Sequence, residues 1–162
     1  AMIRKAGMED LKEILNVYES ARLYMKKSGN PSQWGDSFPP QSTVEEDIEN
    51  ETLYVAELSG RVCGVMEFHI GEEPYYAVLD EGSWIYSGDY ATVHRLASDG
   101  SKRGVFAEFL EFGKGICPHI RIDTHVDNIV MQKLIEKHGF EKCGVFFSTP
   151  ERKWIAYEKI FD

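Results

Sequence analysis

The feature that most constrains the fold of this chain is a strand–turn–helix unit that occurs twice in succession. In the first unit, residues 91–98 have the composition of a strand and run through an Asp-Gly turn at 99–100 into a helix. The apolar face of that helix comprises Val105, Phe109, Phe112 and Ile116. In the second unit, residues 119–125 alternate apolar and polar side chains, and a helix over 128–138 ends at Gly139, which tolerates left-handed geometry. Two such units predict an α/β domain.

Shorter elements are predicted on both sides of these units. Two strand-like runs, 52–58 and 61–70, predict a hairpin because the Ser59-Gly60 pair between them tolerates positive φ. A long amphipathic helix begins at Met8, and a shorter one follows two overlapping capping boxes. The boxes are formed by Ser42, Thr43, Glu45 and Glu46. The other predicted strands are residues 2–5, 141–148 and 153–161.

Length and charge restrict the number of domains and the partners. The chain has 162 residues, which suits a single domain over residues 2–162; we interpret Ala1, ahead of Met2, as a residue added for expression. Lys and Arg total 18 against 27 Asp and Glu, and no basic cluster is interleaved with aromatics, so we expect no nucleic-acid partner. The net charge of -9 is typical of many acidic enzymes and would favour a cationic small molecule or peptide.

The cysteines indicate a reducing compartment. Cys63, Cys117 and Cys143 are odd in number and widely separated, which fits neither a disulfide framework nor a metal knuckle. No run approaches the roughly 18 apolar residues of a membrane span, and no signal peptide is evident. We therefore expect a cytoplasmic protein without a membrane partner.

The turn between the first predicted strand and its helix could bind an anion. Its residues, from Gly100 to Gly104, open the helix, and a helix N-terminus presents unpaired N–H groups and a positive dipole. On this local signal alone, an ordinary strand–helix turn explains the segment at least as well, because Gly-rich turns are common. Neither a Walker loop nor a dinucleotide fingerprint is present.

Several stretches, considered with the order of the elements, carry a family resemblance. They are Ile3–Ala6 at the start, Leu53–Glu57 and Val62–Val65 in the hairpin, and Asp123–Asn128 followed by Lys137–Glu141. Together they resemble the GNAT superfamily of acyl-CoA-dependent N-acetyltransferases over nearly the whole chain. The resemblance implies an α/β (α+β) fold with a central mixed, mostly antiparallel sheet of about seven strands flanked by about four helices.

The resemblance also implies acetyl-CoA as co-substrate and residues that would bind it. Main-chain N–H groups over 103–106 would hold the diphosphate, an N–H near Leu96 or Ala97 would face the thioester oxygen, and Asn128 would bind the pantetheine arm or a nearby carbonyl. The phosphate loop keeps the family's central glycine at Gly104, and the ring at position 106 must point away from the cofactor. The full set is Leu96, Ala97, Ser98, Ser101, Lys102, Arg103, Gly104, Val105, Phe106 and Asn128.

The implied reaction moves an acetyl group to a primary amine of a small molecule or peptide. His94 and Glu67 are the candidate bases, since imidazole titrates near neutrality and burial raises a carboxyl toward it; structural roles for both, with water relaying the proton, stay open. Ile135 stands where the family often has a tyrosine acid, and we expect it near the thioester. The alternative is a non-catalytic acyl-CoA-binding or interaction module.

Two other patterns have weaker interpretations. His119, Asp123 and His125 share a strand face, but their spacing is too long for one ion, so we expect no metal site. Several aromatics could line an amine pocket through cation–π contacts, although ordinary packing explains them as well. They are Trp34, Tyr75, Tyr76, Trp84 and Tyr86. The final strands offer a surface for a homodimer.

Overall fold

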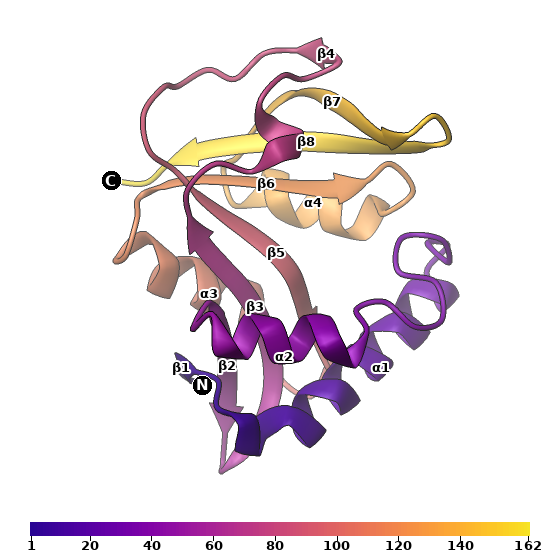
Figure 1. Ribbon diagram of the computed structural model, residues 1–162, viewed down its shortest axis with the longest axis vertical. Coiled ribbons are helices and arrows are strands. Elements are labelled where there is room, and N and C mark those ends of the chain that lie inside the picture. The colour runs from indigo at the N-terminus through magenta and orange to yellow at the C-terminus, as the bar shows by residue number, and fades with distance from the viewer. The chain divides into compact units, whose positions relative to one another are not determined.

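The computed structural model describes residues 1–162 and contains one mixed, mostly antiparallel sheet with four α-helices (Figure 1). The sheet has eight strands in the order β1-β2-β3-β5-β6-β8-β7-β4. The strands are β1 (Met2–Lys5), β2 (Leu53–Leu58), β3 (Arg61–Ile70), β4 (Glu81–Gly82), β5 (Ala91–Ser98), β6 (His119–His125), β7 (Glu141–Thr149) and β8 (Arg152–Ile160). The helices are α1 (Leu11–Lys27), α2 (Gln41–Glu49), α3 (Val105–Lys114) and α4 (Ile129–Lys137), with 3-10 turns η1 (Met8–Asp10) and η2 (Pro74–Tyr76). The predicted fold class is confirmed, with the short β4 as an additional strand.

The chain divides into two compact units that share β5. The first unit comprises Ala1–Phe68 and His94–Gly113, and the second comprises His69–Val93 and Lys114–Asp162. The last five residues of β5 therefore belong to the first unit and its first three to the second. No helix is both long enough and apolar enough to span a membrane.

The core of the first unit forms where α1 and α2 bury their apolar faces. Ile14 and Tyr18 of α1, Val44 of α2, and Leu53 and Val55 of β2 are all inaccessible to solvent in one cluster. Burial of such side chains contributes roughly 1.5–3 kcal/mol each, which explains why the predicted amphipathic pattern of α1 forms a stable helix.

The β2–β3 hairpin is closed as predicted, and α3 packs directly on it. Ser59 and Gly60 both have positive φ, 53° and 77°, as a tight two-residue turn requires. In β3, a Cβ on Gly64 would lie only 2.6 Å from Cγ1 of Val105, so the absence of a side chain allows α3 to approach the strand closely.

Helix boundaries differ from prediction at two places. The helix α2 begins at Gln41 with Pro40 as its N-cap, so Ser42 and Thr43 lie inside the first turn and no side-chain cap forms. The predicted capping boxes are therefore wrong, because Pro40 supplies the extended residue that precedes the helix. The helix α3 stops at Lys114, and Ile116 lies beyond it with 45% of its surface exposed rather than on the buried face.

The second unit is built from an antiparallel set of strands. β6 pairs with β8 along its whole length, β8 pairs with β7, and β4 pairs with β7. The parallel pairing of β5 with β6 extends only from Ala91–Ile120 to Val93–Ile122. The helix α4 ends at Lys137 with His138 as its C-cap, and Gly139, the predicted terminator, follows with a φ of +86°.

A buried ionic cluster attaches the long connection before β5 to the sheet of the second unit. Glu158 is inaccessible to solvent and accepts hydrogen bonds from His119 Nε2 at 2.6 Å and Arg121 Nε at 2.9 Å. The same carboxylate accepts from the N–H of Ile85 at 2.8 Å, and the guanidinium of Arg121 lies 4.2 Å from the ring centre of Trp84. Because a buried carboxylate requires such partners, this cluster holds the connection in place.

Candidate functional site

The turn after β5 is organised by its own side chains. Oδ1 of Asp99 accepts hydrogen bonds from both the N–H and the hydroxyl of Ser101, at 2.9 and 2.6 Å. Ser98 Oγ accepts from the N–H of Gly100 at 3.2 Å, and the N–H of Asp99 donates to the carbonyl of Cys63 on β3 at 3.0 Å. These contacts fix the turn, and they already occupy the polar groups of Ser101 that were expected to bind the cofactor.

Gly104 opens the N-terminus of α3 to free space. Its φ is +78°, and a Cβ placed on it would meet no atom within 4 Å. Its carbonyl accepts the first helical hydrogen bond, from the N–H of Glu108 at 3.1 Å. Val105 and Phe106, the next residues, are buried at 4% and 6% exposure, so their side chains leave the outer face of the turn clear. The geometry suits an anion approaching the main chain of the first helical turn.

The basic side chains of the turn are not equivalent. Lys102 Nζ lies 2.6 Å from Oε2 of Glu108, and this ion pair lowers the pKa of the Glu108 carboxyl. The charge of Lys102 is therefore partly neutralised by Glu108, whereas Arg103 is exposed to solvent. Of the two basic residues in the predicted cofactor-binding set, Arg103 is the one better placed to reach an incoming phosphate.

The two candidate bases lie together in the first unit. Nδ1 of His94 is 4.0 Å from Oε1 of Glu67. Glu67 is only 3% exposed, whereas the His94 side chain is 23% exposed. The imidazole is thus the member of the pair that an amine substrate could reach, and the carboxylate can stabilise its protonated form.

Arg95 lies in β5 between the candidate base and the turn. Its φ of 47° is left-handed, which is rare for a residue with a side chain and rarer still within a strand. The Arg95 carbonyl accepts a hydrogen bond from the Tyr18 hydroxyl at 2.8 Å, and its guanidinium binds Asp47 at 2.7 and 2.9 Å. Leu96 and Ala97, expected near the thioester, follow this residue directly; Ala97 is 6% exposed.

Sequence reasoning missed the three residues of this arrangement. The sequence pattern indicated no functional role for Tyr18, and Asp47 had no distinguishing feature. An arginine among the apolar residues of a predicted strand was the single available signal, because a buried guanidinium requires an acidic partner.

Asn128 and Ile135 both have structural roles in the second unit. The Asn128 side chain accepts a hydrogen bond from the N–H of Met131 at 3.0 Å and so caps α4. Ile135, the position of the expected tyrosine, is inaccessible to solvent and contributes to the core.

The three β6 residues considered as a metal set bind different partners. His119 contacts Glu158, Asp123 Oδ2 accepts a 2.5 Å hydrogen bond from the Tyr76 hydroxyl, and Nδ1 of His125 accepts from the N–H of Asp127 at 3.1 Å.

The aromatics considered for an amine pocket differ in exposure. In the first unit, Trp34 is 9% exposed and packs edge-on against Tyr18. In the second, Tyr76 is 1% exposed and contacts the ring of Trp84, whereas Tyr75 and Tyr86 are exposed. Trp34 and Tyr76 thus pack in the cores of their units.

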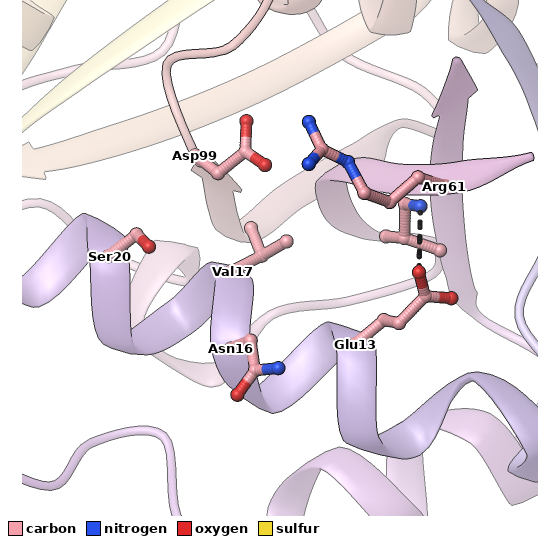
Figure 2. A pocket seen from close by; sticks show the side chains of 7 residues that line it. Glu13, Asn16, Val17, Ser20, Arg61 and Asp99 are labelled. Carbon is pink, nitrogen blue, oxygen red and sulfur yellow. Dashed lines mark hydrogen bonds between the residues drawn. The ribbon is translucent and has the colours of Figure 1, made fainter. Parts of the chain in front are cut away.

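A polar pocket of about 180 Å³ lies beside the turn, within the first unit (Figure 2). It is lined by Glu13, Asn16, Val17, Ser20, Arg61, Val62 and Asp99. Figure 2 shows the helix α1 forming one wall, with Glu13 accepting a hydrogen bond from the N–H of Val62 at 3.4 Å. Because Asp99 also holds Ser101, this pocket borders the turn directly.

Comparison with solved structures identifies the architecture. An acetyltransferase of the GNAT family from Streptococcus agalactiae superposes with a TM-score of 0.89 at 29% identity, covering 99% of this chain and 95% of the other. This chain has the GNAT fold. A putative acetyltransferase from Staphylococcus aureus covers 100% of both chains with a TM-score of 0.71 and 28% identity.

More distant acetyltransferase structures share the fold alone. They include the ribosomal-protein-S18-alanine N-acetyltransferase of Escherichia coli, with 14% identity, a TM-score of 0.65, and coverage of 99% of this chain and 94% of that one. No protein-family model matches the sequence, and no curated protein matches it either. Structural neighbours along the full chain include acetyltransferases of the GNAT family, which confirms the predicted resemblance, and the GNAT fold generally implies use of an acyl-CoA.

Proposed function

We propose that this GNAT protein transfers an acetyl group from acetyl-CoA to a primary amine of a small molecule or peptide. One observation carries the proposal: residues 94–106 place a partly exposed histidine, a left-handed strand residue and an open helix N-terminus in one continuous segment of the first unit. A site for acyl transfer needs a base, donors to the developing oxyanion and a grip on the cofactor. This segment can provide all three.

The diphosphate would bind at the turn that opens α3. The N–H groups over 103–106 and the positive end of the helix dipole would face the phosphates, and Gly104 would permit their close approach. Arg103 would add a charge-assisted contact. Asn128 belongs to the second unit, and the role expected for it on the pantetheine arm stays a prediction.

When bound, acetyl-CoA supplies an electrophilic acyl carbon and a thiolate leaving group. The amine nitrogen forms the new C–N bond with its lone pair, the C–S bond breaks, and its electron pair stays on sulfur. His94 takes the proton that the amine loses, and the thiolate takes a proton from solvent, because Ile135 has no proton to give. The N–H of Leu96 or Ala97 stabilises the negative charge that develops on the thioester oxygen.

The first experiment separates this enzyme from a non-catalytic acyl-CoA-binding or interaction module. The module is favoured by Ile135, which is completely buried and cannot donate a proton where the family often has a tyrosine acid. Titration calorimetry measures acetyl-CoA binding, and a thiol-release assay with a panel of primary amines measures turnover. Binding with turnover supports the enzyme, binding alone supports the module, and absence of both contradicts the two proposals together. The acceptor is expected to be cationic, since the protein carries a net charge of -9.

A histidine variant tests the base. His94→Asn retains a polar group near the position of Nδ1, which faces Glu67, but it cannot titrate. We expect kcat to fall about 100-fold, with acetyl-CoA affinity little changed. His138→Asn, at the end of α4 in the second unit, is the matched control and should leave turnover near wild type. Equal kcat values for the His94 variant and wild type would remove this histidine from the mechanism.

A further inference from the structure

We infer that Tyr18 and Asp47 are positioning residues, which hold Arg95 in its left-handed conformation and thereby direct the N–H of Leu96 toward the reacting thioester. The inference deepens the proposed function and rests on it. It assigns a role in the reaction to two side chains, one from α1 and one from α2, that would not themselves touch substrate.

The conformation of Arg95 requires support. A φ of 47° places its Cβ close to its own carbonyl oxygen, at a cost of about 1–2 kcal/mol relative to an extended residue. In an ordinary strand, nothing would compensate for this cost, and the residue would relax to the β region. A strained residue persists only where its surroundings fix it, and such residues are concentrated at functional sites.

Two contacts from different helices fix this residue at both ends. The Asp47 carboxylate accepts hydrogen bonds from Arg95 Nε at 2.7 Å and Nη2 at 2.9 Å, which form a bidentate pair. Asp47 is 6% exposed and the Arg95 side chain is 20% exposed. The Tyr18 hydroxyl, from a side chain inaccessible to solvent, donates to the Arg95 carbonyl at 2.8 Å. The side chain and the following peptide group are therefore both anchored.

Anchoring the carbonyl also fixes the next N–H group. The peptide bond is planar, so the carbonyl of Arg95 and the N–H of Leu96 lie in one plane and point in opposite directions. Because Tyr18 holds the oxygen, it sets the direction of this N–H as well. An oxyanion donor must be oriented before the reaction to lower the barrier, and even a modest misorientation weakens it.

A second ion pair in the same unit provides a matched control. Arg4 binds Asp10 through two hydrogen bonds of 2.8 Å, and Asp10 is 4% exposed. The bidentate geometry and the burial of the carboxylate are closely similar to those of the Arg95–Asp47 pair. Arg4 is not among the residues with positive φ, and it lies on β1. Loss of this pair should therefore lower stability without altering the direction of any N–H on β5.

The test compares Tyr18→Phe, Asp47→Asn and Asp10→Asn by turnover, acetyl-CoA binding and hydrogen–deuterium exchange. Tyr18→Phe keeps the buried ring and removes only the hydroxyl. We expect it to lower kcat about tenfold, to leave the acetyl-CoA Kd within about twofold, and to speed amide exchange over 94–97. Asp47→Asn should act in the same direction. Asp10→Asn should lower the urea midpoint of unfolding yet leave kcat within about twofold of wild type.

Three outcomes would overturn the inference. Unchanged exchange over 94–97 in both Tyr18→Phe and Asp47→Asn would show that these residues do not hold the strand. Faster exchange with unchanged kcat would show that the held N–H has no role, and an equal kcat loss in Asp10→Asn would indicate a general stability effect. A wild-type protein that binds acetyl-CoA but releases no thiol would contradict the proposed function instead, and the exchange measurement would still decide whether the two side chains anchor Arg95.

Discussion

Replacing Gly104 with valine separates the two properties that glycine provides at the mouth of α3. The first property is the left-handed φ of +78°, which a branched residue adopts at a cost of about 1–2 kcal/mol in folding free energy. The second is open access to the N–H groups beyond it. Since a Cβ would meet no protein atom within 4 Å, the valine side chain would stand in solvent, where the phosphates are proposed to lie. We expect acetyl-CoA to bind more than about tenfold more weakly, or about 1.4 kcal/mol.

The hairpin turn supplies the control for this variant. Gly60 has a φ of +77° and likewise no atom within 4 Å of a placed Cβ, so Gly60→Val should lose comparable stability without touching the cofactor turn. Urea unfolding gives the stability of both variants, and titration calorimetry gives their acetyl-CoA affinities. Wild-type affinity in the Gly104 variant, or an equal loss in the Gly60 variant, would refute a phosphate site at this turn.

Two further predictions concern the second unit. Glu158→Gln should destabilise the protein by about 3 kcal/mol, because it leaves the buried guanidinium of Arg121 without its counter-charge, whereas exposed Glu141→Gln should cost less than about 0.5 kcal/mol in urea unfolding. Burial raises the pKa of Glu158, but the hydrogen bonds from His119 and Arg121 outweigh burial and lower the pKa below 4.5. The ionised Glu158 carboxylate therefore stabilises the fold above pH 4.5, and this stability is lost as the pH falls through the pKa of the folded state. The wild type should thus lose more stability on acidification than the glutamine variant. Ile135→Tyr should overpack a closed site, lowering the melting temperature without raising thiol release; a gain in turnover would contradict this placement.

The local elements could be predicted because short-range chemistry determines them. The Ser59-Gly60 turn and the stop of α4 at Gly139 both follow from residues that tolerate positive φ. The apolar periodicity of α1 likewise predicted a buried face that is present in the core. In each case the determining residues lie within one or two turns of the feature.

Features that depend on distant partners could not be predicted in this way. The two-residue strand β4 exists because β7 pairs with it, and Glu81 and Gly82 alone contain no strand signal. The start of α2 was misplaced because Ser42 and Thr43 are good capping residues, yet Pro40 already provides the extended conformation before the helix.

The candidate site follows the same division. His94 and Glu67 were chosen separately for their chemistry, and only the fold shows that they lie 4.0 Å apart. The left-handed conformation of Arg95 has no sequence signature, because it results from contacts with Tyr18 and Asp47, which lie 77 and 48 positions away along the chain. A strained backbone held by tertiary contacts is therefore the part of a site that sequence reasoning is least able to find.

Arg95 and Gly104, two of the three residues with positive φ in the segment 94–106, have different physical roles. At Gly104 a glycine adopts positive φ without a steric penalty, and a Cβ placed there would meet no atom within 4 Å. At Arg95 a glycine would remove the strain, but it would also remove the guanidinium that binds Asp47. A strained residue whose side chain and carbonyl are both anchored suits a position where the direction of the following N–H matters. A glycine, which adopts positive φ without strain, suits a position where a ligand needs only access to the main chain. The chain thus combines a rigid position beside the candidate base with an open one at the proposed phosphate site.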